Sequence, residues 1–98
     1  MTNFKQITHL SPATAVDGYL EFELGKAIKV GVDLDFAGIG QSIFVKLENE
    51  TDFTEVVIKE TGMFELGPTH FDGNLLSPVI THIRIPEGIH FSVEYISI

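Results

Sequence analysis

The stretch that decides the fold is residues 80–98, with the sequence ITHIRIPEGIHFSVEYISI. Apolar and polar residues alternate with a period of two on both sides of the break at Pro86, Glu87 and Gly88. Such alternation is typical of a β-strand that has one face in a core and the other towards solvent. Two alternating runs around a short Pro-Glu-Gly break predict a β-hairpin at the centre of a sheet.

The register of this hairpin follows from its apolar residues. Pairing Ile85 with Phe91 and Ile83 with Val93 brings all four apolar side chains to one face, as a hairpin that covers a core requires. Residues 87–89 then form a three-residue loop. In this register the predicted hairpin is a central element of the core.

Composition and charge narrow the class of protein. The chain has 98 residues, no cysteine, and a net charge of −8 from 14 acidic and 6 basic residues. The length fits one domain, residues 1–98, and without cysteine no disulfide or thiolate metal site can form. An acidic surface without a basic patch disfavours nucleic acid as a partner. The chain has no signal-like start and no apolar run of about 20 residues, so we expect a cytoplasmic protein with no membrane contact.

Further strand-like segments precede the hairpin, at residues 4–10, 19–24, 28–36, 43–47, 53–59 and 63–66. Gly25 and Lys26 form a short connection, which predicts a tight hairpin between 19–24 and 28–36. Eight candidate strands joined mostly by turns predict an all-β fold, a single antiparallel β-sandwich of jelly-roll type. A small closed barrel is the alternative.

Several apolar residues fall outside the alternating core pattern and are candidates for a protein interface. They occupy a glycine-rich loop tip, the long irregular segment 67–79, and the outward face of the last strand. The candidates are Phe36, Ile39, Phe71, Leu75, Leu76, Ile96 and Ile98. The loop residues can instead fold back onto the core of their own chain.

Metal-binding patterns are weak. Asp33 and Asp35 lie side by side on one strand face and could share a calcium ion, but we favour a solvated strand face, since no calcium-loop motif surrounds them. His70 and Asp72 share the long irregular segment, where an ordinary loop is favoured over a metal site. We therefore expect no metal and no cofactor.

Catalytic motifs are also missing. No serine lies in a Gly-x-Ser-x-Gly elbow, and Gly38 and Gly40 have no following helix that would bind a phosphate. The hairpin register places His82 opposite Glu94, where a cross-strand pair is favoured over a general base. We expect that the protein is not an enzyme and has no catalytic residues.

The segments FVKLENETDFTEVVIKETGMFEL (44–66), ITHIRIP (80–86) and FSVEYISI (91–98) together resemble small all-β virion proteins of tailed bacteriophages. These include capsid decoration, head-fibre and neck or tail accessory proteins. The resemblance covers about the last sixty residues and rests on pattern, so it transfers no functional residue. It implies a structural protein of the virion that binds capsid or tail proteins and itself as a symmetric oligomer.

The second hypothesis is a carbohydrate-binding β-sandwich module. Tyr19, Phe71 and Asn74 are the residues that could form a glycan groove. The chain has no tryptophan and only two tyrosines, so the supply of stacking side chains is small. The sequence therefore favours the structural hypothesis over the glycan-binding one.

Overall fold

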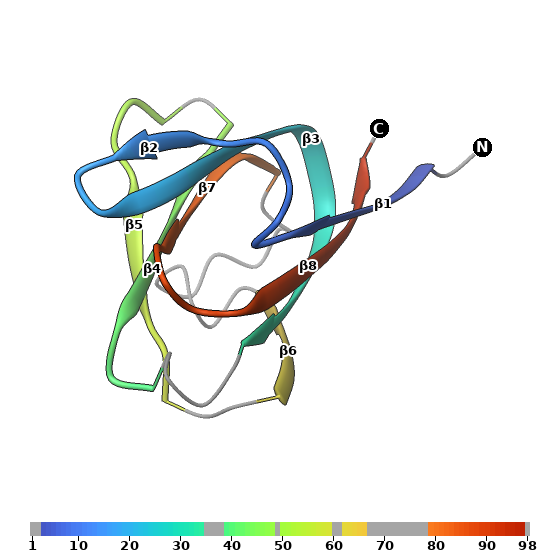
Figure 1. Ribbon diagram of the computed structural model, residues 1–98. Coiled ribbons are helices and arrows are strands. Elements are labelled where there is room, and N and C mark those ends of the chain that lie inside the picture. Colours follow the sequence, from blue (N-terminus) through green and yellow to red (C-terminus); the bar gives the residue numbers. More distant parts are fainter. Residues whose placement is uncertain (1–2, 35–38, 49, 60–61, 67–78, 98) are drawn as a thin grey trace.

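The computed structural model describes residues 3–34, 39–48, 50–59, 62–66 and 79–97, without the side chains of residues 3–4 and 62–65 (Figure 1). The described residues contain eight strands and no helix. The strands are β1 (Asn3–Thr8), β2 (Thr14–Val16), β3 (Tyr19–Leu34), β4 (Ser42–Leu47), β5 (Thr54–Val57), β6 (Gly62–Leu66), β7 (Ile80–Pro86) and β8 (Phe91–Ser97). The predicted all-β class is confirmed.

Hydrogen bonds join all eight strands into one antiparallel sheet with the order β1-β8-β3-β7-β4-β5, and β2 and β6 also pair with β3. The two separate sheets of a jelly-roll-like sandwich are therefore not confirmed. One long strand, β3, instead bends and serves two parts of the same sheet (Figure 1).

The pairing partners of β3 define its two edges. Residues 19–21 pair with β2 and also with β7, so these two strands lie on opposite edges. Ala27 pairs with Ile80 of β7 and with Ser97 of β8, so β8 lies on the same edge as β2. Residues 30–34 pair with β6 and with β8. We call residues 19–26 of β3 with β2, β7, β4 and β5 the first arm, and residues 27–34 with β6, β8 and β1 the second arm.

The bend in β3 comes from bulges between the two arms. From Glu23 to Ala27 the chain advances four residues while its β7 partners, His82 and Ile80, advance only two. Gly25 has a φ of +72°, a conformation that side chains disfavour and glycine adopts freely. The tight hairpin predicted at Gly25 and Lys26 is therefore wrong, because both predicted strands belong to β3.

The bulge also changes which residues face the core. Leu24, Ala27 and Val30 are buried, while Ile28 is 39% exposed. Ile28 falls outside the core because the extra residues shift the alternation before it resumes at Val30.

The core lies between the inner faces of the two arms. Its fully enclosed side chains come from both arms and include Ile43, Val45, Ile83, Ile85, Val32 and Val93. Phe22 of the first arm meets Phe91 of the second edge to face, with ring centroids 5.7 Å apart. The predicted core face of Ile83, Ile85, Phe91 and Val93 is thus confirmed as a set of buried residues.

The predicted hairpin between the last two strands is wrong, although both strands exist. β7 pairs with β3 and β4, and β8 pairs with β1 and β3. Ile83 accordingly lies opposite Phe22 and Val45 rather than Val93. Each of the two strands pairs with strands from other parts of the chain. Local alternation does not show which strands pair.

The Pro-Glu-Gly break is a crossover between the arms. The Glu87 amide donates to the Gly18 carbonyl over 2.9 Å, and the His9 amide donates to the Phe91 carbonyl over 3.3 Å. These bonds fix the start of the crossover to the first arm and its end to the chain after β1. Ile89 is buried, so the crossover also closes one end of the core.

Candidate functional site

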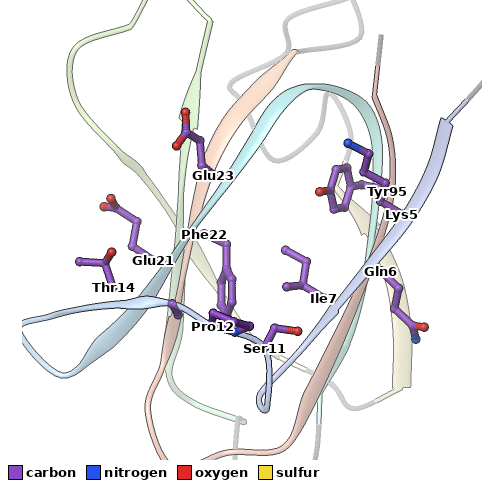
Figure 2. Close-up of a pocket in the computed structure, with 11 residues that line it drawn as sticks. Lys5, Gln6, Ile7, Ser11, Pro12, Thr14, Glu21, Phe22, Glu23 and Tyr95 are labelled. Carbon is purple, nitrogen blue, oxygen red and sulfur yellow. The ribbon is translucent and has the colours of Figure 1, made fainter.

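An open cleft of about 840 Å³ lies between β1 and β3 (Figure 2). We call it the β1–β3 cleft. Its lining consists of Lys5, Gln6, Ile7, Ser11, Pro12, Ala13, Thr14, Glu21, Phe22, Glu23 and Tyr95. This volume is within the range of pockets that hold small ligands or short peptide segments.

The cleft exists because one edge of β3 is covered incompletely. On that edge β2 pairs as far as Glu21, and β8 pairs only from Ala27 onwards. No described strand pairs with residues 22–26 on this edge. β1 faces the same gap, because β8 is its sole partner among the described strands.

The walls of the cleft are strand edges rather than strand faces. Each wall contributes three consecutive residues, 5–7 from β1 and 21–23 from β3. Successive side chains of a strand point to opposite faces, so three consecutive residues line a space only where the backbone edge itself borders it. The cleft therefore presents backbone as well as side chains to an occupant.

The two carboxylates of the β3 wall differ in their partners. Arg84 Nε donates to Glu21 Oε1 over 2.7 Å, and the Arg84 guanidinium also lies 4.0 Å from the centre of the Phe53 ring. Glu23 is exposed and has no ion pair within the described part of the chain. Lys5 is exposed on the β1 wall. Glu23 is thus the available negative charge of the cleft.

Aromatic side chains form the base of the cleft. Tyr95 is only 8% exposed, and burial raises the pKa of its hydroxyl above the ordinary value. Figure 2 shows Ile7 and the Tyr95 hydroxyl directed towards the gap between the strands. Phe22 is buried. None of these rings offers an open face on which a sugar could stack.

The described lining residues form no catalytic arrangement of side chains. Its lining includes no histidine, and the Ser11 hydroxyl accepts a hydrogen bond from the Thr8 amide at 3.0 Å in the turn after β1. Within the described ranges, no group of three or more histidine or acidic side chains could hold a metal ion. The residues can therefore bind an occupant, and they offer no nucleophile paired with a base.

The histidines are arranged differently from the prediction. His82 lies opposite Glu23 and Lys46, not Glu94, so the predicted cross-strand pair is wrong. His9 and His90 instead stack with their ring centroids 4.2 Å apart and their planes 10° apart. They line a small pocket of about 280 Å³ beside Asp33. Their separation of 81 positions along the chain gave no signal for this contact.

Only two of the seven predicted interface residues lie in the described part of the chain. Ile39 is 42% exposed, and Ile96 is half-buried on the face of β8 opposite to Phe91 and Val93, as expected. Phe36, Phe71, Leu75, Leu76 and Ile98 lie outside the described residues. Val57, which is 51% exposed, was not among the predicted interface residues.

The remaining candidates are mostly outside the described chain. Asp33 is exposed, while Asp35, His70 and Asp72 are not described. Of the glycan candidates, Phe71 and Asn74 are likewise not described. Tyr19 packs edge to face against Phe44 with centroids 5.3 Å apart.

Comparisons with protein-family models, curated proteins and solved structures give no significant match. None of the described residues belong to a helix long and apolar enough to cross a membrane.

Proposed function

We propose that the protein is a non-enzymatic structural protein of a tailed-phage virion, which joins or decorates a capsid or tail through contacts with itself and with neighbouring proteins. The observation that carries the proposal is the exposure of Ile39 and Val57 at one end of β5, a strand whose outer edge has no partner among the described strands. The pattern resemblance of residues 44–66, 80–86 and 91–98 supplies the virion setting.

The β5 edge has the features of a contact surface. β5 pairs with β4 through Ser42 and Val57, and no described strand pairs with its other edge. The Gly40 amide donates to the Ile58 carbonyl over 2.9 Å, which fixes Ile39 near the same end of β5. Exposed apolar side chains and a strand edge without a described partner each favour association with another chain. A second copy of this chain is the partner that we propose for this edge.

The β1–β3 cleft supports the non-enzymatic part of the proposal. Its charged residues are separated between two walls, and Glu21 is already paired with Arg84. Binding by shape, backbone and charge is the chemistry that such a site offers. Capsid and tail proteins, which associate through surfaces, fit this chemistry.

The test is the oligomeric state and particle association of the protein. We expect light scattering to give a mass above that of one chain, and we expect the protein to co-purify with a phage particle. The double variant Ile39→Ser, Val57→Lys should return to a single chain with unfolding free energy within about 0.5 kcal/mol of the parent, since both side chains are exposed.

Leu10→Ser is the matched control for that variant. Leu10 is 83% exposed in the turn after β1, away from β5, so its replacement should leave the oligomer intact. A parent protein that is monomeric at all concentrations and absent from particles would contradict the proposed function.

A carbohydrate-binding module is the second candidate. The observation in its favour is a row on the outer face of the first arm, where Tyr19 and Phe44 lie half-buried and Phe53 packs on Arg84. Aromatic rings beside charged side chains are common in glycan sites. A glycan array tests it, and a monomer that binds one defined sugar would reverse the order of the two candidates.

A further inference from the structure

We propose that the β1–β3 cleft is an acceptor for one extended segment of a partner protein, which adds as a strand to the free edge of β3 and places a basic side chain beside Glu23. The proposal deepens the proposed function and rests on it, since it assumes that the molecule works by attaching to another protein. It concerns a surface distinct from the β5 edge.

One edge of β3 is interrupted at the cleft. Residues 22–26 lie between the end of the β2 pairing and the start of the β8 pairing, so their peptide groups on this edge lack a strand partner among the described residues. Five extended residues would span about 16 Å, and the bulge between Glu23 and Ala27 makes this edge shorter. An extended segment of similar length can supply the missing backbone hydrogen bonds, as in other complexes formed by strand addition.

Side chains of the two cleft walls alternate between the inner and outer faces of the sheet, and this alternation predicts which side chains of the occupant are apolar and which are polar. Glu23 and Gln6 belong to the outer face of the sheet, since Glu23 lies opposite His82 and Gln6 lies opposite Glu94. Phe22 and Ile7 belong to the inner face, where both pack with the core. A strand between these walls should place apolar side chains inward and polar ones outward.

Charge decides which polar side chains fit the outer face. Glu21 is paired with Arg84, whereas the exposed Glu23 has no such partner among the described residues. Lys5 belongs to the inner face of the sheet, because it is adjacent to Gln6 in β1 and lies opposite Tyr95. The chain as a whole carries a net charge of −8. A lysine or arginine beside Glu23 therefore gains an ion pair and attraction from the whole molecule, and an acidic residue is repelled.

The probe is a blocked heptapeptide, Val-Lys-Val-Lys-Val-Lys-Val, titrated into the full chain and followed by amide chemical shifts. We expect shifts centred on residues 22–26 and 5–7. The same peptide with glutamate in place of lysine should bind at least tenfold more weakly. A lysine peptide with methylated backbone nitrogens should not bind, because it cannot donate to the β3 edge.

Two exposed carboxylates on β3 give matched variants. Glu23→Gln should weaken binding of the lysine peptide about two- to fivefold, the size of one exposed ion pair. Asp33→Asn, at the far end of the same strand, should leave the affinity unchanged. Both positions are exposed, so neither change should impair folding.

The outcomes separate this proposal from the proposed function. Failure of the lysine peptide to bind at millimolar concentration, equal binding of the methylated peptide, or preference for the glutamate peptide would each overturn the acceptor site. If the protein still forms oligomers and enters particles, the proposed function survives that failure. Peptide binding in the cleft by a monomer that never joins a particle would support the acceptor and overturn the virion role.

Discussion

The two edges of β3 differ in how other strands cover them. On one edge β7 pairs with residues 19–23 and again at Ala27, with a bulge between, and β6 pairs along residues 30–34. On the other edge β2 and β8 leave residues 22–26 without a described partner, and the cleft opens there. One strand thus stabilises the fold along one edge and offers a binding site along the other.

The largest expected effect is on the covered edge. Ile83 of β7 is fully buried opposite Phe22, so Ile83→Ala removes core contacts and leaves a cavity. We expect a loss of about 2 to 5 kcal/mol in the free energy of unfolding, measured by urea denaturation. Thr14→Ala on the exposed β2 should change it by less than about 0.5 kcal/mol. Similar losses in both variants would contradict the unequal roles of the two edges.

A smaller effect is expected at the bulge that separates the arms. Gly25 has a φ of +72°, and a Cβ built there would meet no atom within 4 Å. Gly25→Ala should therefore cost about 1 to 2 kcal/mol through backbone strain alone. Lys26→Ala is the control, expected within about 0.5 kcal/mol of the parent because Lys26 is exposed. A stabilising Gly25→Ala would show that the bulge is absent in solution.

The smallest effect concerns the base of the cleft and appears only at alkaline pH. Burial raises the pKa of the Tyr95 hydroxyl in the folded state above that of the unfolded chain. Below the unfolded value of about 10 the hydroxyl is neutral in both states, and above it the unfolded chain loses the proton first. Stability should hold up to about pH 10 and then fall.

Tyr95→Phe provides the control for this pH dependence. Its unfolding free energy should decline less steeply above pH 10 than that of the parent, because the group that ionises is gone. Equal slopes for the two proteins would show that Tyr95 does not contribute. Unfolding by urea at several pH values measures both slopes.

The sequence predicted which residues lie in strands and which face the core better than it predicted how strands pair. Val30, Val32 and Leu34 are buried as their alternation requires, because burial of one face leaves a local pattern. Strand pairing depends on contacts between residues that are distant in the sequence. The break after Pro86 was therefore predicted as a hairpin turn, whereas in the structure it is a crossover. Gly25 looked like a turn for the same reason, since a glycine with positive φ suits a turn and a bulge alike.

The candidate site could not be predicted from the sequence. The β1–β3 cleft arises where no described strand pairs with one edge of residues 22–26, and the residues themselves carry no pattern that indicates such a gap. Glu23 reads as an ordinary solvent-facing residue of an alternating strand. Ile39 was predicted as an interface candidate because it lies at a glycine-rich loop tip; it is 42% exposed, and its role in an interface stays a prediction.

Amide hydrogen exchange along β3 tests the open edge most directly. Residues 30–34 pair on both edges, so we predict that their amides are all protected in the free protein. Of residues 22–26, β7 pairs only with Phe22 and Glu23, so we predict protection only for an amide of these two that is directed at β7, and rapid exchange for the others. Uniform slow exchange across residues 22–26 would contradict the open edge, and with it the acceptor site.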